Sequence, residues 1–127
     1  MKLPISPCNQ AGARLLLALA LMIITYMALT PAPGPIQEAV NDKLGHLAAF
    51  ALLALLVHAS WPHRDFDWRM ILPLLAYGIA IECAQYFIPN RFFSLLDILA
   101  DGTGILLYLL LLPLLLHWRK PTPASPS

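Results

Sequence analysis

Residues 13–30 read ARLLLALALMIITYMALT, an apolar stretch that carries one charged side chain, Arg14, at its start. A helix that crosses the hydrocarbon core of a bilayer needs roughly 20 predominantly apolar residues. A cleaved signal peptide has a shorter apolar core, about 7 to 15 residues, and Pro31 is a poor residue to follow a cleavage point. The stretch therefore predicts a transmembrane helix that is retained in the protein.

The remainder of the chain repeats this pattern. Apolar stretches of similar length occupy residues 43–60, 68–88 and 95–118, and prolines stand in the breaks between them. The composition agrees, because 59% of residues are hydrophobic and 12% are charged, whereas about a quarter of residues are charged in a soluble domain. We expect an all-α polytopic membrane protein with four transmembrane helices in a domain at 13–118. A segment at 1–12 precedes this domain, and a Pro/Ser-rich tail at 119–127, expected to be disordered, follows it.

The basic residues predict the orientation of these helices. Short cytoplasmic loops carry an excess of Lys and Arg. With the N-terminus inside, most of the 8 basic residues are cytoplasmic and only Lys43 and Arg91 face outward. Both termini are therefore predicted to be cytoplasmic, and Cys8 and Cys83 then lie on opposite sides of the membrane, where they cannot form a disulfide. The net charge of +1 and the lack of a basic stripe argue against a nucleic-acid partner.

The polar residues of the predicted spans gather at the outer ends of the last three helices. They recur at separations of three or four residues, as in Lys43 and His46 or Asp97 and Asp101, and such pairs share one helical face. Ionisable residues within membrane helices are candidates for a functional site. The candidate site residues are Asp42, Lys43, His46, Glu82, Gln85, Arg91, Asp97 and Asp101.

Glu82 needs compensation, since a charged side chain at the bilayer centre costs about 2.5 to 3.5 kcal/mol on insertion scales. Arg91 lies a few residues away across a proline turn, and a guanidinium binds carboxylates bidentately without losing its proton. We therefore expect Arg91 to reach back over the group and compensate Glu82, with Lys43 and a protonated His46 as further compensation for the clustered carboxylates. Ser94, three residues before Asp97, is expected to cap the fourth helix.

The residues that carry this pattern resemble a known family. DKLGHLAAF at 42–50 and ECAQYFIPNRFFSLLDILADGTG at 82–104 are similar to the VanZ-like family of small bacterial membrane proteins. The family pattern is Asp-Lys-x-x-His, then Glu-x-x-Gln, a Pro-x-Arg turn, and an Asp followed by a polar residue and a glycine. Members often carry asparagine where this chain has Asp101. The resemblance implies a multi-pass protein of the bacterial cytoplasmic membrane, in a family whose named member confers low-level resistance to teicoplanin, with no reaction attached.

Four interpretations of the polar group remain open at this point. It could be a structural clasp between three helices. It could be an outward-facing pocket that binds an envelope lipid headgroup, a lipid-linked cell-wall intermediate or a lipoglycopeptide, with Lys43 and Arg91 receiving a phosphate. It could be the site of an outer-leaflet enzyme with Glu82 or His46 as acid/base and Arg91 stabilising developing charge. A small transporter is disfavoured, because no matching polar set lies at the inner ends.

Whether the protein is an enzyme therefore stays undecided from the residues. No P-loop, zinc-protease or nucleophile-elbow motif is present. One histidine among carboxylates has no diagnostic metal spacing, so we expect no metal and no cofactor. Membrane lipids are the expected partners, and self-association is left open.

Overall fold

The computed structural model describes residues 1–31 and 38–118, with side chains from residue 42 onward in the second range. The predicted tail at 119–127 lies outside the described residues. The described part is all-α and contains no strand, which confirms the predicted fold class. Its helices are α1 (Pro7–Leu29), α2 (Glu38–Ser60), α3 (Trp68–Gln85) and α4 (Leu95–Trp118).

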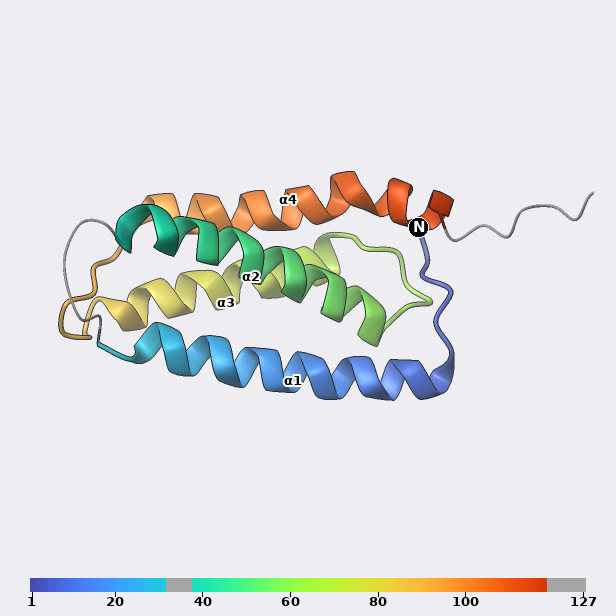
Figure 1. Ribbon diagram of the computed structural model, residues 1–127, viewed down its shortest axis with the longest axis horizontal. Helices are drawn as coiled ribbons and strands as arrows, with labels where there is room; N and C mark the ends of the chain where they lie inside the picture. Colours follow the sequence, from blue (N-terminus) through green and yellow to red (C-terminus); the bar gives the residue numbers. More distant parts are fainter. Residues whose placement is uncertain (32–37, 119–127) are drawn as a thin grey trace, which may run out of the picture.

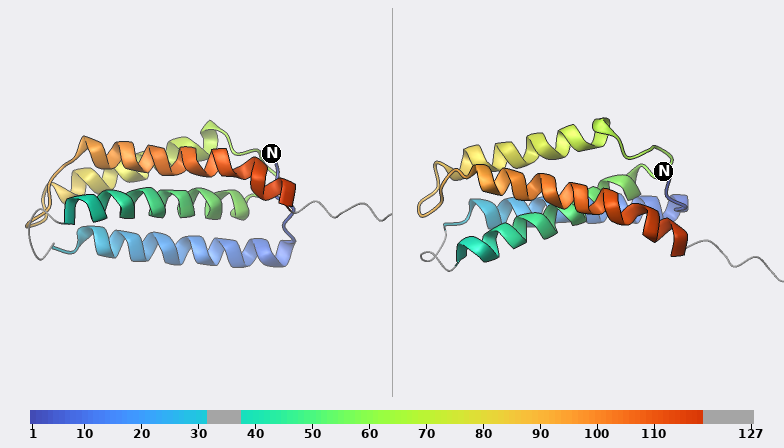
Figure 2. Two further views of the ribbon diagram at one scale, coloured as in Figure 1. Left: turned by 45° about the horizontal axis from the view of Figure 1, so that its top comes forward. Right: turned by 90° about the horizontal axis from the view of Figure 1, so that it is seen from above.

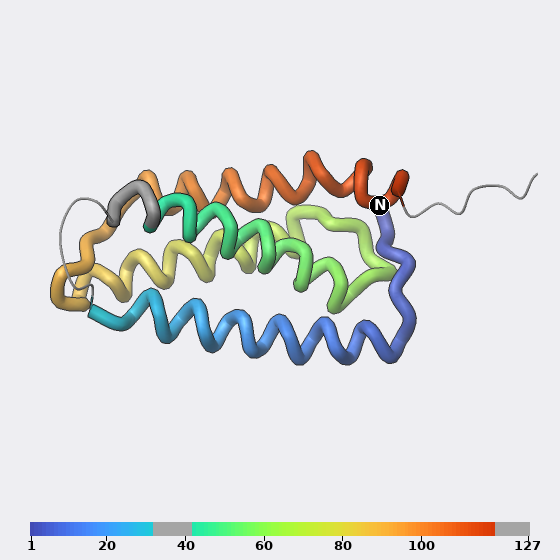
Figure 3. The backbone as a smooth tube through the Cα atoms, viewed as in Figure 1, coloured from blue at the N-terminus to red at the C-terminus, as the bar shows by residue number. Residues whose placement is uncertain are grey.

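The four helices form an antiparallel up-and-down bundle (Figure 1). α2 lies at the centre, because it packs against each of the other three helices, most extensively against α4. The left view of Figure 2 shows α2 between α4 and α1. The trace shows that α1 and α3 finish at the same end at which α2 and α4 begin (Figure 3). We call this end the polar end and the opposite one, near residue 1, the basic end.

Local signals account for the helix boundaries. The side chain of Ser6 accepts a hydrogen bond from the backbone N–H of Asn9, and Pro7 occupies the first turn of α1, where proline is tolerated. Asp67 caps α3 by accepting from the backbone N–H of Arg69 at 3.0 Å. Between α3 and α4, Asn90 has φ 62°, a left-handed conformation that asparagine adopts more readily than most residues. This turn directs Arg91 back toward the ends of the other helices.

Three helical stretches are long and apolar enough to cross a membrane: Pro7–Leu29, Asp42–Ser60 and Leu95–Trp118. α3 has 18 residues and is less apolar. The sequence predicted a third span at 68–88, but the helix ends at Gln85. α1 begins at Pro7, within the segment at 1–12 that precedes the first predicted span.

The distribution of apolar side chains is that of a membrane protein. Large apolar residues cover the outside of the bundle, among them Met22 (66% exposed), Leu110 (65%) and Leu99 (64%). Buried carboxylates lie inside it, including Glu82 and Asp101. A soluble bundle shows the opposite arrangement. The apolar core runs along the middle of α2 and includes Phe50, Leu53, Leu74, Ile105 and Tyr108.

Candidate functional site

His46 is the centre of the polar end. Its Nδ1 lies 2.7 Å from Oδ1 of Asp101, and its Nε2 lies 3.7 Å from both Oε1 of Glu82 and Oδ2 of Asp97. One imidazole from α2 therefore faces three carboxylates from α3 and α4. We use "polar cluster" for these residues and the ones that flank them, namely Asp42, Lys43, His46, Glu82, Arg91, Asp97 and Asp101.

Exposure within the polar cluster falls with depth. The side chains of Asp42 and Lys43 are 40% and 37% exposed, whereas that of His46 is 11% exposed and that of Glu82 is fully buried. Asp42 and Lys43 thus form the accessible rim.

The buried carboxylates have more acceptor capacity than the protein uses. Oε1 of Glu82, Oδ1 of Asp97 and Oδ2 of Asp101 are buried and accept no hydrogen bond within the described residues. Lys43 Nζ lies 3.7 Å from Oδ1 of Asp97, a distance for an ion pair and not for a hydrogen bond. An unsatisfied buried polar group costs about 1–3 kcal/mol, and more when it is charged. A purely structural clasp between helices does not need buried carboxylate oxygens that accept no hydrogen bond.

The expected compensation of Glu82 by Arg91 is wrong. Arg91 donates from Nε to the carbonyl of Thr30 and from Nη2 to that of Met27, both at 3.1 Å, and its Nη1 lies 3.6 Å from Asp42. Its ion pairs within the described residues do not include Glu82. The second oxygen of Glu82 instead accepts a hydrogen bond from the backbone N–H of Ser94, at 3.0 Å. The guanidinium holds the end of α1 and the start of α2 to the α3–α4 turn.

Gln85 does not join the polar cluster. Its side-chain amide donates to the carbonyl of Ala28 at 3.0 Å, so it links α3 to α1. The structure brings the remaining candidate residues together at the polar end. Ser94 caps α4 as predicted, because its Oγ accepts from the backbone N–H of Asp97 at 3.4 Å.

Two glycines allow close contacts beside the polar cluster, one with the side chain of Asp101 and one with the backbone of α2. A Cβ at Gly78 would collide with Oδ2 of Asp101, and one at Gly104 would collide with the carbonyl of Leu47 on α2. The role of Gly78 was missed in the sequence. Its signal is a glycine in the middle of a helix, an unfavourable residue there that needs a packing reason.

Three residues of the polar cluster could also hold a cation. Ligand atoms of Asp42, His46 and Asp97 all lie within 4.8 Å of one another. Imidazole and carboxylate are suitable ligands for several divalent metals. Lys43 already supplies a positive charge to Asp97, so this geometry is compatible with a metal without requiring one.

The geometry can be compared with known proteins. The VanZ/LLP1 family model matches residues 15–116. The chain belongs to the VanZ/LLP1 family. The match extends beyond the residues that suggested it, since it covers most of α1 as well as α2, α3 and α4. No curated protein and no solved structure matches this VanZ-family chain.

Proposed function

We propose that this VanZ-family protein works at the outer face of the bacterial cytoplasmic membrane, with both termini inside. There its polar cluster binds the headgroup of a lipid-linked envelope component or a lipoglycopeptide, and by doing so it contributes to glycopeptide tolerance. The protein is proposed to act by binding, without a resident metal or cofactor.

The surplus of buried acceptors is the observation that supports this proposal. Three buried carboxylate oxygens in the polar cluster have no hydrogen-bond donor among the residues that the structure describes. The carboxylate groups that carry these oxygens surround His46, and ligand atoms of His46 and the exposed rim residue Asp42 lie within 4.8 Å of each other. Ionisable groups inside a membrane are costly to bury, and they are therefore candidates for a functional site.

The charge balance indicates which part of a ligand enters. The polar cluster has four carboxylates against the two permanent cations Lys43 and Arg91. Both cations have partners here: Arg91 contacts Asp42 and two backbone carbonyls, and Lys43 pairs with Asp97. A bare phosphate is therefore a poor fit. Carboxylates accept hydrogen bonds from sugar hydroxyls and from ammonium groups, both of which suit this site.

A second candidate function is acid–base catalysis on a lipid-linked substrate. It is favoured by the contact between Asp101 and Nδ1 of His46, because a carboxylate at one ring nitrogen fixes the tautomer and orients the other nitrogen for proton transfer. In this scheme His46 or Glu82 exchanges a proton with substrate, and Asp101 is a positioning residue.

The test compares teicoplanin susceptibility and membrane abundance in a sensitive bacterial host. The host expresses wild type, Glu82→Gln, Asp42→Asn, or the exposed control His117→Gln. We expect wild type and the control to protect, and both polar-cluster variants to be abundant but to protect poorly. Equal protection by all four proteins would contradict a working site at the polar cluster. If none protects although all are abundant, the glycopeptide role is wrong for this chain.

The same variants separate binding from catalysis. Asp42 lies on the rim, so Asp42→Asn should weaken a binding site strongly while leaving an enzyme partly active. Glu82→Gln keeps the shape of the side chain and removes its acid, so an enzyme that uses Glu82 should be nearly silent. A larger loss of protection in Asp42→Asn therefore favours binding, and a larger loss in Glu82→Gln favours catalysis.

A further inference from the structure

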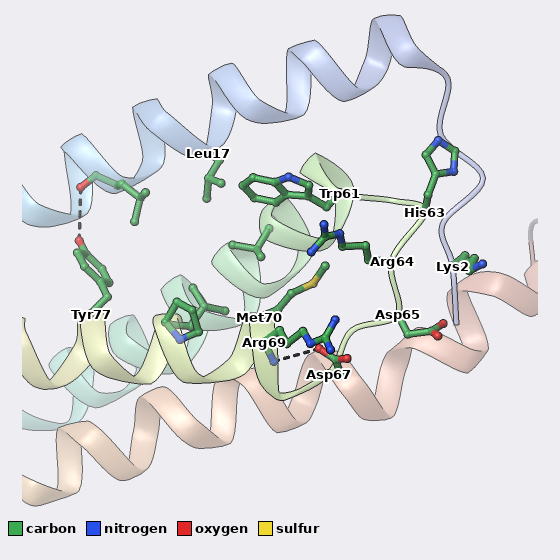
Figure 4. A pocket seen from close by; sticks show the side chains of 14 residues that line it. Lys2, Leu17, Trp61, His63, Arg64, Asp65, Asp67, Arg69, Met70 and Tyr77 are labelled. Carbon is green, nitrogen blue, oxygen red and sulfur yellow. Dashed lines mark hydrogen bonds between the residues drawn. The ribbon is translucent and has the colours of Figure 1, made fainter.

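A cavity of about 790 Å³ extends from the loop at the basic end of the bundle to Tyr77 of α3 (Figure 4). It is lined by residues of α1, α2, α3 and the segment that joins α2 to α3. Tyr77 limits it toward the middle of the bundle, where its hydroxyl lies 2.6 Å from Oγ1 of Thr25 on α1. The cavity is within the range of about 300–1,000 Å³ that is usual for small-molecule sites.

One part of this cavity is apolar. Leu17 of α1, Met70 and Leu74 of α3, and the ring of Trp61 line it together (Figure 4). Between Met70 and Tyr77 the helical rise is about 10 Å. This length accommodates several methylene groups of an acyl chain that enters alongside α1 and α3.

The other part is basic. Lys2, Arg64 and Arg69 line the cavity near the loop, and Arg64 extends toward Trp61 beside Met70 (Figure 4). Within the residues that the structure describes, none of these three side chains takes part in an ion pair. The guanidinium of Arg69 lies over the ring of Trp68, 5.6 Å from its centroid, and its side chain donates no hydrogen bond within the described residues.

The acidic residues of the cavity are already engaged. Asp65 pairs with the terminal ammonium of Met1 at 2.6 Å, which lowers the pKa of its carboxyl. Asp67 accepts the hydrogen bond that caps α3. The positive charges of Lys2, Arg64 and Arg69 therefore prevail beside the apolar part of the cavity.

We propose that this cavity is a binding site for a phospholipid with an anionic headgroup, whose phosphate contacts Arg64 and Arg69 and whose acyl chain lies against Leu17 and Leu74. Arginine suits phosphate because its fork of donors makes bidentate contacts. A lipid is the occupant that matches both parts, since a free phosphate would leave the apolar part unused. The site is separate from the polar cluster, so it does not depend on the function proposed above.

Quenching of Trp61 by brominated lipid tests this proposal. Trp68→Phe and Trp118→Phe leave Trp61 as the single tryptophan of the full chain, reconstituted in nanodiscs. Two series of nanodiscs are compared. One contains an increasing fraction of brominated phosphatidylglycerol, and the other contains an increasing fraction of brominated phosphatidylcholine with identical acyl chains. We expect half-maximal quenching at a roughly tenfold lower fraction of phosphatidylglycerol, because basic residues near a membrane surface each favour anionic lipid.

The decisive variant is Arg64→Gln with Arg69→Gln, which should abolish the preference for phosphatidylglycerol. Arg119→Gln with Lys120→Gln is the matched control, since it removes the same charge from residues that follow α4, and it should keep the preference. Helical circular dichroism and size exclusion confirm that each variant is folded.

Three results would overturn the proposal. Equal quenching by the two lipids would exclude headgroup recognition. Loss of the preference in the matched control as well would reduce the effect to general surface charge. A change of Trp61 fluorescence on addition of inorganic phosphate, in nanodiscs where phosphatidylglycerol causes no more quenching than phosphatidylcholine, would assign the site to the free anion instead of the lipid.

Discussion

His46 separates carboxylates that would otherwise repel one another. It contacts Asp101 directly and stands 3.7 Å from Glu82 and Asp97. Removal of one partner from a buried ionic group typically costs about 3–5 kcal/mol, because it leaves charges buried without compensation. The imidazole is therefore the residue on which the polar cluster depends most.

His46→Gln is expected to lower the free energy of unfolding by about 3 kcal/mol. The measurement is chemical unfolding in detergent micelles, followed by helical circular dichroism. His117→Gln, the same substitution at an exposed position, should change the value by no more than about 0.5 kcal/mol.

A double substitution sharpens this expectation. Asp101→Asn in the His46→Gln background removes the carboxylate that has lost its closest partner, so it should restore part of the stability. If His46→Gln unfolds like wild type, the imidazole does not compensate these carboxylates.

At the scale of residues, the sequence predicts well which side chains come together. It predicts less well which of them contact each other. Helical spacing places His46, Glu82, Asp97 and Asp101 on facing surfaces, and the structure brings them together. Arg91 shows the limit, because proximity in sequence suggested Glu82 while the turn at Asn90 sends the guanidinium to α1 and α2. The hydrogen bond from the backbone N–H of Ser94 to Glu82 cannot be predicted from residue types, because every residue except proline has a backbone N–H.

At the scale of helices, the contact of α2 with α4 depends on Gly104. A Cβ at this position would meet the carbonyl of Leu47 and would lie 3.0 Å from the backbone nitrogen of Ala51. Backbone atoms cannot rotate away as a side chain can. Small residues of this kind let membrane helices approach closely.

Gly104→Ala is expected to destabilise the bundle by about 1–3 kcal/mol through overpacking. Gly102→Ala is the control, since its Cβ would find only Leu75 Cδ2 at 3.9 Å, and it should be neutral or slightly stabilising. Thermal unfolding in micelles gives both values. Equal effects at the two positions would show that the close approach at Gly104 is unimportant.

Apolar stretches predict the helices well, but their ends less well. α2 and α4 end close to the predicted residues. α3 stops at Gln85 because Tyr86, Phe87 and Ile88 form turns with backbone bonds to the preceding residues. Hydrophobicity does not distinguish such turns from helix, so the predicted span was too long.

At the scale of the whole molecule, the two ends of the bundle differ in chemistry. Acidic groups are buried at the polar end, and a basic cavity lies near the other. The excess of Lys and Arg near the basic end predicts that this end is cytoplasmic.

Labelling with a membrane-impermeant maleimide tests this orientation. In a Cys83→Ser background, Cys8 near the start of α1 should react only after cell lysis. Phe92→Cys, introduced in the α3–α4 loop where Phe92 is 81% exposed, should react in intact cells when both native cysteines are replaced by serine. The reverse pattern would place the polar cluster on the cytoplasmic side and contradict the proposed function.

The short, weakly apolar α3 has a consequence for biogenesis. It carries Glu82 and Gln85, and a helix of 18 residues with a buried acid has little tendency to remain in lipid by itself. Its partners for those groups come from α2, from the α3–α4 turn and from α1. α3 must therefore leave the insertion machinery together with its neighbours, and the polar cluster assembles as the chain enters the membrane and not after it.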